Sequence, residues 1–160
     1  MLHAALTVLL LAATPTTARV VTVHDGDTIT VKLDGHTDKV RLVGIDSPEL
    51  DDERSEYRSA AYAARDFARS LLGGETVKLE PEARQGDRDK YGRLLRYVIL
   101  DDGTNVNEVM VRKGYAHVYS RFDFTLKSRF RQAEDEAKRG KLGVWALPPG
   151  PWREVPASAR

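Results

Sequence analysis

The sequence contains no cysteine, which excludes disulfide scaffolds, thiol nucleophiles and cysteine-ligated zinc. It has only four histidines, and none of them forms an H-x-x-x-H or similar ligand pair, so a histidine-built zinc site is not expected. No apolar run approaches the ~20 residues of a membrane-spanning helix. What remains is a chain of 160 residues with 41% apolar and 31% charged residues, a balance typical of one soluble globular domain.

An excess of one charge is also missing, since 25 basic residues face 24 acidic ones. The resulting net charge of +1 argues against nonspecific adhesion to nucleic acid through the whole surface. The charges are nevertheless segregated along the chain, with acidic side chains gathered in 49–53 and basic ones in 112–131. A local anion-binding site is therefore compatible with the near-zero net charge.

The two ends of the chain are not predicted to belong to the fold. Residues 1–18 carry no charged side chain, and their apolar run at 4–13 is followed by small residues before Arg19, as in a secretory signal peptide. This predicts a secreted protein, extracellular or periplasmic. The alternatives are a membrane tether by an uncleaved leader and an ordinary N-terminal strand. The proline-rich residues 148–160 are expected to form a flexible tail, which leaves 19–147 as the domain.

Hydrophobic periodicity predicts strands in the first third of the domain and then a long helix. The valines of 20–23 predict a first strand, apolar residues alternate with polar ones in 29–33, and 39–45 (KVRLVGI) is predicted as a third strand. Asp34-Gly35 marks a turn between the second and third strands. The helix that follows ends at Gly73-Gly74. Its predicted apolar face consists of Ala60, Ala64, Phe67, Ala68 and Leu71.

Two more strands and two more helices are predicted in the second half. The strands are expected around 77–79 and at 94–100, and Asn105 with Glu108 resembles a capping box for a short helix. A last helix is expected near 124–139, with Leu126, Phe130, Ala133 and Ala137 on one face. The pattern predicts an α+β fold, and five strands with a helix after the third indicate a small, partly open barrel of the OB type.

Three short polar segments carry the candidate chemistry. They are Asp25-Gly26-Asp27-Thr28, the segment from Arg41 to Glu49, and Asp89-Lys90-Tyr91-Gly92-Arg93. Each segment alone is typical of a turn or a solvated loop. The second segment is less easily explained in that way, because Asp46, Glu49 and the acidic run 51–53 concentrate more negative charge than a turn needs.

Taken together, the three segments are chemically complementary. Hard oxygen ligands without histidine or cysteine favour Ca²⁺ or Mg²⁺ over a transition metal. Arg41 and Arg93, on separate elements, suit the oxygens of a phosphate, and Glu49 can serve as a base for water. A cation, an arginine pair and a carboxylate base are the groups needed to hydrolyse a phosphodiester by in-line attack.

At this point the sequence resembles a known family. The motifs V-x-D-G-D-T, R-L-x-G-I-D-S-P-E and D-K-Y-G-R, followed by N-x-x-x-V-x-x-G and L-G-V-W, closely resemble those of the thermonuclease family, typified by staphylococcal nuclease. The resemblance extends from about Val20 to Trp145. It implies a five-stranded OB barrel with three helices, a Ca²⁺ cofactor, DNA and RNA as substrates, and cleavage that leaves 3′-phosphates.

The resemblance also implies a role for each matching residue. Asp27 and Asp46 correspond to calcium carboxylates, and Ser47 to a residue that binds calcium through its main-chain carbonyl. Glu49 corresponds to the general base, and Arg41 and Arg93 to the arginines on the scissile phosphate. Lys90 and Tyr91 correspond to residues near the nucleotide, and Asp25 lies beside the metal. Tyr115 and Tyr119 stand out of register with the family's later tyrosines.

Other classes of function remain open at this stage. One is an OB-type module that binds nucleic acid without cleaving it, since folds of this kind bind single strands in many proteins. The other is a secreted structural protein with a vestigial site. No stable protein partner is implied, and a monomer is expected.

Overall fold

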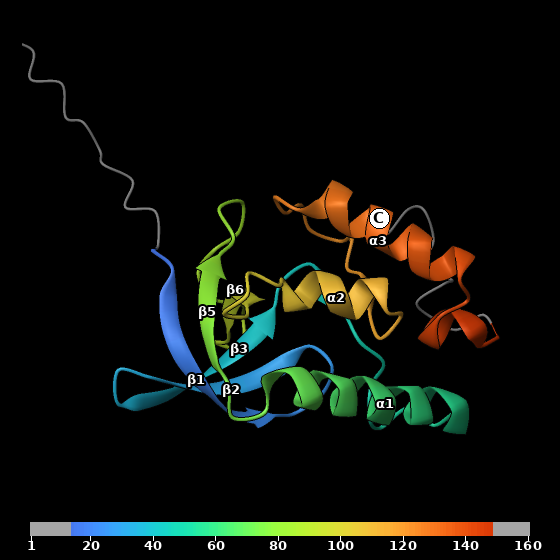
Figure 1. The fold of residues 1–160 in the computed structure, drawn as a ribbon, viewed down its shortest axis with the longest axis horizontal. Coiled ribbons are helices and arrows are strands. Elements are labelled where there is room, and N and C mark those ends of the chain that lie inside the picture. The colour runs from blue at the N-terminus through green and yellow to red at the C-terminus, as the bar shows by residue number, and fades with distance from the viewer. Residues whose placement is uncertain (1–13, 149–160) are drawn as a thin grey trace, which may run out of the picture.

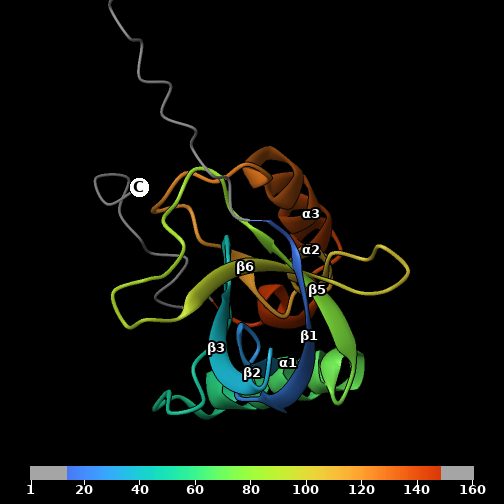
Figure 2. The same cartoon turned by 90° about the vertical axis from the view of Figure 1, so that its left-hand side faces the viewer.

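The computed structural model describes residues 14–148, and its centre is a closed barrel of five strands (Figures 1 and 2). The strands follow one another around the barrel in the order β1-β2-β3-β6-β5. Their bounds are Thr16–Val23 (β1), Thr28–Leu33 (β2), His36–Leu42 (β3), Thr76–Pro81 (β5) and Leu94–Ile99 (β6). The predicted five-stranded barrel is confirmed, although it is closed and not partly open.

One parallel pair of strands allows the barrel to close. β2 and β3 form an antiparallel hairpin whose turn, Asp34-Gly35, has positive φ at both residues (48° and 86°), as a type I′ turn requires. β3 then pairs in parallel with β6, with Arg41 opposite Leu95. β1 completes the circle by pairing antiparallel with both β2 and β5.

Helices α1 and α2 contact the barrel strands β1 and β6, and α3 packs on α2, so that α2 lies between α1 and α3 (Figure 1). Their bounds are Ser55–Leu72 (α1), Val106–Arg112 (α2) and Lys127–Arg139 (α3). The buried face of α1 is rotated from the predicted one, because Tyr57, Ala61 and Leu72 are buried while Ala60, Phe67 and Leu71 are only half-buried. Alanines on both sides of the stripe make it wide, so that periodicity alone does not define its centre.

The starts of α2 and α3 differ in how well the sequence predicted them. The side chain of Asn105 accepts a hydrogen bond from the backbone N–H of Glu108 (3.1 Å), which confirms the N-cap of α2. The Glu108 carboxylate, however, pairs with Arg112 and Arg129. α3 begins at Lys127, later than predicted, and Phe124 is buried in the core ahead of the helix.

The predicted third strand, 39–45, is divided in two. β3 ends at Leu42, and Ile45–Asp46 (β4) pairs instead with His117–Val118 (β7) in a separate two-stranded sheet. Gly44 lies between the two strands at a φ of +79°, and a Cβ there would lie 2.6 Å from the ring of Phe124. The glycine therefore permits a sharp change of direction that a side chain would prevent.

The ends of the domain differ slightly from the prediction. β1 begins at Thr16 and pairs with β5 from its first residue, so the barrel starts ahead of the predicted boundary at 19. The rest of the predicted signal peptide, 1–13, and the tail 149–160 lie outside the described residues. A 3₁₀ turn (η1, Gly143–Ala146) follows α3, and the Tyr57 hydroxyl donates a hydrogen bond to the Pro148 carbonyl. No helix in residues 14–148 is long and apolar enough to cross a bilayer.

A buried asparagine joins α2 to the barrel. The Asn107 side chain is fully buried, and its amide donates to the carbonyls of Val43 and Arg96 at 3.0 and 3.1 Å. Its side-chain oxygen accepts from the backbone N–H of Val98 at 3.0 Å. These bonds satisfy backbone groups at the point where β3 ends beside β6, which is also where the chain turns toward β4.

Replacing Asn107 by alanine should lower the free energy of unfolding by ~2–5 kcal/mol, because the Val98 N–H and the Val43 carbonyl lose their side-chain partner inside the core. Asn105→Ala is the matched control, since it removes one N-cap bond worth ~1 kcal/mol. Urea-induced unfolding at pH 7 measures both variants. A cost for Asn107→Ala no larger than that of the control would contradict this role.

Candidate functional site

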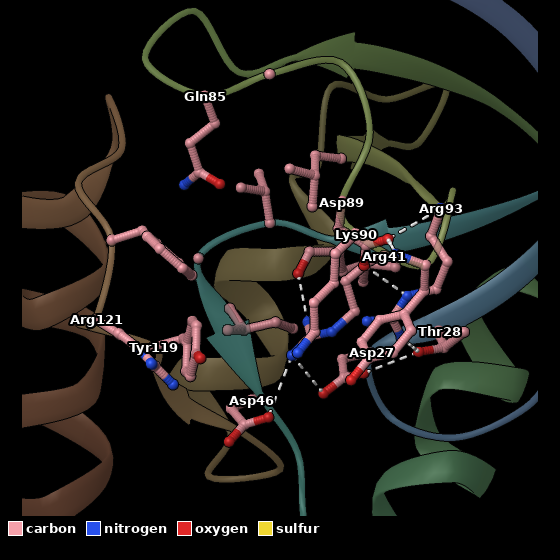
Figure 3. A pocket seen from close by; sticks show the side chains of 18 of the residues that line it. Asp27, Thr28, Arg41, Asp46, Gln85, Asp89, Lys90, Arg93, Tyr119 and Arg121 are labelled. Carbon is pink, nitrogen blue, oxygen red and sulfur yellow. Dashed lines mark hydrogen bonds and ion pairs between the residues drawn. The ribbon is translucent and has the colours of Figure 1, made fainter.

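The candidate residues converge on one pocket of about 840 Å³ (Figure 3). Its walls come from four parts of the chain, namely 25–28, 41–49, 84–95 and 119–122. Every candidate residue except Ser47 lines it, which brings together Asp25, Asp27, Arg41, Asp46, Glu49, Lys90, Tyr91 and Arg93. Ser47 is buried next to the lining, and its backbone N–H donates to Asp27 Oδ2 at 2.8 Å.

Arg41 lies at the centre of the acidic side of the pocket. Its Nη2 is 3.2 Å from Asp27 Oδ2 and 3.1 Å from Asp46 Oδ1, and its Nη1 donates to the Leu42 carbonyl at 2.7 Å. Asp27 is itself buried, and its other oxygen accepts from the Thr28 hydroxyl at 3.0 Å. The guanidinium therefore bridges two carboxylates that come from different elements of the fold.

The negative charge in the pocket exceeds what Arg41 can balance. Burial and then the charge of Asp27 raise the pKa of Asp46 to about 7, despite the opposing effect of Arg41. Burial and the charge of Asp27 also raise the pKa of Asp25. Crowded carboxylates with raised pKa values are relieved by a hard cation, so these oxygen donors fit Ca²⁺ or Mg²⁺. In residues 14–148 as they stand, no three acidic or histidine side chains already converge on one point.

Glu49 stands at the edge of the same acidic group. Desolvation and the charges of Asp27 and Asp25 raise the pKa of its carboxyl group, with Arg41 acting in the opposite direction. A raised pKa brings a carboxylate closer to the working range of a general base near neutral pH. Glu49 lines the pocket and does not belong to either of the ion pairs of Arg41.

Arg93 is oriented by its own loop. Asp89 accepts from the Nε of Arg93 at 2.8 Å and from its backbone N–H at 3.0 Å, while the Arg93 Nη1 lies 3.4 Å from the Thr28 hydroxyl. Two cations approach the ring of Tyr91. The guanidinium of Arg93 lies 5.5 Å from the ring centroid, and the ammonium group of Lys90 lies 4.9 Å from it. Tyr91 is largely exposed, so this part of the loop presents an aromatic face and two cations at the pocket.

Sequence reasoning missed several residues of the pocket. Asp89 and Thr28 stand inside the quoted motifs, but their roles as partners of Arg93 and Asp27 depend on contacts that motifs do not show. Tyr119 lines the pocket although it stands out of register with the family's later tyrosines, and its ring lies 5.9 Å from that of Phe122. Tyr115, in contrast, stacks on Phe67 at 4.4 Å and is absent from the pocket lining.

A histidine that carried no sequence signal also lies beside the acidic group. His117 is paired with Asp46 across the β4–β7 sheet, and its Nε2 is 3.6 Å from Asp46 Oδ2. Burial lowers the pKa of His117 to about 4, so the ring is neutral at pH 7. It therefore adds no positive charge to offset the carboxylates.

Comparison with known proteins shows the family of the chain. A family model described as staphylococcal nuclease homologue matches residues 39–147. The chain belongs to this family. The match contains Arg41, Asp46, Glu49 and Arg93, whereas Asp27 precedes it.

Several relatives match most of the chain. An uncharacterized endonuclease of Escherichia coli O157:H7 is 37% identical over 139 residues, which are 84% of this chain and 83% of the relative. The thermonuclease of Staphylococcus hyicus is 32% identical over 131 residues, covering 81% and 76% of the two chains. The micrococcal nuclease of Shigella flexneri is 32% identical over 152 residues, covering 88% and 82%.

The crowding of carboxylates predicts a stabilising substitution. Because the folded pKa of Asp46 is raised above its ordinary value, ionisation of Asp46 costs stability as pH rises from about 4 to about 7. Asp46→Asn should therefore increase the free energy of unfolding at pH 8 in EGTA, by on the order of 1 kcal/mol after solvent screening. The gain should disappear near pH 4. Urea unfolding across this pH range tests the effect, with the exposed Asp66→Asn as the control; an Asp46→Asn variant less stable than wild type at pH 8 would refute it.

Proposed function

We propose that this chain is a secreted, calcium-dependent nuclease that acts as a monomer and hydrolyses phosphodiester bonds of DNA and RNA to leave 3′-phosphate ends. Membership of the staphylococcal nuclease homologue family supports nuclease activity. Calcium dependence and the cleavage mechanism rest on the pocket. It is lined by the guanidinium groups of Arg41 and Arg93 and by several carboxylates, Glu49 among them. Secretion rests on the leader pattern in 1–18 alone.

The two arginines are suited to hold the scissile phosphate. Arg41 and Arg93 enter the pocket from β3 and from the loop before β6, so they can contact different oxygens of one phosphate. Guanidinium groups bind phosphate through paired N–H donors, and such contacts strengthen as charge accumulates on the oxygens in the transition state. Asp89 keeps Arg93 directed toward the pocket.

The acidic residues divide between metal binding and proton transfer. Asp27 and Asp46 would hold calcium through their carboxylates, together with the main-chain carbonyl of Ser47. When bound, the ion would supply positive charge that offsets the carboxylates and the phosphate. Glu49 accepts a proton from water, whose oxygen attacks phosphorus as the bond to the 5′ oxygen breaks. The phosphate then stays on the 3′ oxygen. The departing 5′ oxygen takes a proton from solvent to become a hydroxyl, and Glu49 returns its proton to solvent.

The direct test is cleavage of single-stranded DNA and RNA by the purified chain in Ca²⁺, in Mg²⁺ and in EGTA, followed by analysis of the new ends. The proposal predicts cutting in Ca²⁺ that stops in EGTA and leaves 3′-phosphates. A folded protein that retains the oligonucleotide without cutting it would replace the nuclease with a binding module. Cutting that persists in EGTA would remove the calcium requirement.

Replacing the proposed catalytic residues should lower the rate of cleavage by amounts that differ with the role of each residue. Arg93→Ala and Arg41→Ala should each lower kcat/KM by about three decades, because each removes a cation from the transferring phosphate. Glu49→Gln should lower kcat by ~10²–10⁴-fold, because the amide cannot accept the proton. Initial rates on a single-stranded oligonucleotide measure all three. Arg65→Ala, on α1 and outside the pocket lining, is the charge-matched control and should retain wild-type rates. A folded Arg93→Ala variant with near-full activity would contradict the phosphate role.

A further inference from the structure

The loop that supplies Arg93 is tied to the barrel at its base. This loop, residues 82–93, connects β5 to β6, and we call it the Arg93 loop. The carbonyl of Asp87 accepts from the backbone N–H of Leu95 at 3.0 Å, and its carboxylate pairs with the buried Arg96 at 2.5 Å. These contacts join the base of the loop to β6. They do not reach 88–93, the part that carries Lys90, Tyr91 and Arg93.

The tip of the Arg93 loop is held together internally. Asp89 accepts hydrogen bonds from the backbone N–H groups of Tyr91 and Arg93 at 2.9 and 3.0 Å, as well as from the Arg93 Nε. Its lowered pKa keeps it ionised, since these hydrogen bonds outweigh the effect of burial. Asp89 thus orients Arg93 relative to the tip. Because Asp89 itself belongs to the tip, it cannot orient the tip relative to the barrel.

Arg88 makes that connection. Its Nη1 and Nη2 contact Asp38 Oδ1 and Oδ2 at 2.9 and 2.5 Å, a paired contact to strand β3. The same Nη1 donates at 2.7 Å to the carbonyl of Gly92, the residue directly before Arg93. Within the described residues, the other polar contact between 88–93 and β2 or β3 is the long one from Arg93 to Thr28, at 3.4 Å.

The position of Asp38 gives this ion pair a functional consequence. Asp38 lies on β3, the strand that also carries Arg41. The Arg88 guanidinium therefore contacts both β3, the strand that carries Arg41, and the carbonyl of Gly92, the residue directly before Arg93. Most exposed ion pairs contribute little, but paired arginine–carboxylate geometry is the recognised exception, and the Asp38 side chain is only 15% exposed.

We propose that Arg88 and Asp38 are positioning residues that fix the spacing between Arg41 and Arg93. The inference rests on the proposed nuclease function, and it adds two residues that are absent from the pocket lining. Without the ion pair, the base of the Arg93 loop, the Asp89 contacts and the Val40–Leu94 pairing directly after Arg93 persist, so the loop stays folded. What the tip loses is the link from Gly92 through Arg88 to β3, so this part can shift relative to the strand. A shift of about 1 Å in a catalytic group can cost on the order of 100-fold in rate.

Arg88→Gln and Asp38→Asn test the pair, with Asp38→Glu as the conservative variant. We expect each of the first two to lower kcat on single-stranded DNA by ~10-fold while KM changes less than threefold, because a misplaced guanidinium loses mainly the contacts that tighten in the transition state. The double variant should be no slower than either single variant, since both break one interaction. Asp38→Glu, which keeps a carboxylate for Arg88, should stay within threefold of wild type.

Two results would overturn the proposal. One is a kcat for Arg88→Gln within twofold of wild type. The other is a double variant whose loss equals the product of the single losses, since that would make the two residues independent. Arg65→Gln, which breaks the Arg65–Asp66 pair on α1, controls for the loss of one surface cation and should leave kcat unchanged.

A second readout does not depend on activity. Amide hydrogen exchange of Gly92 and Arg93 should be faster in Arg88→Gln than in wild type, whereas amides of β2 and β3 should keep their protection. Unchanged exchange at Gly92 and Arg93 would show that the ion pair does not hold the tip. If the wild-type chain does not cut nucleic acid, the proposed function fails, while this measurement still decides whether Arg88 restrains the loop.

Discussion

The site depends on one electrostatic constraint, which is the concentration of carboxylates in one pocket beside the guanidinium group of Arg41. Arg41 bridges Asp27 and Asp46, yet the pKa of Asp46 is still raised to about 7. A fold that keeps such a group partly ionised loses stability at neutral pH unless a cation compensates it. This cost is consistent with a site selected for binding and catalysis, because crowding of like charge brings no gain in stability by itself.

The barrel creates this crowding by bringing strand ends and turns together. Gly26 lies so close to its neighbours that a Cβ there would be 2.7 Å from Ser47 and 3.0 Å from Ala64 of α1. Gly44 performs a similar role by turning the chain from β3 into β4, which places Asp46 beside Arg41. The acidic side of the pocket is therefore built by close backbone packing, which longer side chains at these two glycines would disrupt.

The sequence predicted the parts of the fold that have a strong local signal. The β2–β3 hairpin follows from its Asp34-Gly35 turn, and the N-cap of α2 follows from Asn105. The break at Gly44 was missed, because the apolar residues of 39–45 are typical of one continuous strand and the reason for the break is the distant ring of Phe124. Local patterns contain no information about such a contact.

The same distinction holds for the site. Charged residues within the motifs, such as Asp46 and Arg93, were predicted as site residues, and they line one pocket. Their individual roles remain predictions. Tyr119 and His117 reach the site through the β4–β7 pairing, which the sequence did not indicate. Arg88 and Asp38 are separated by 50 positions, and each alone resembles an ordinary surface charge. Only the fold shows that they meet.

The most direct test of the central claim is thermal unfolding of the wild-type chain at pH 8, in millimolar Ca²⁺ and in EGTA at equal ionic strength. If the carboxylates form a cation site, calcium binds the folded state and raises the midpoint of unfolding in proportion to the logarithm of its concentration. The same increase should be absent in Asp27→Asn, which lacks the buried carboxylate at the centre of the group. An identical midpoint for the wild-type chain in Ca²⁺ and in EGTA would contradict the account.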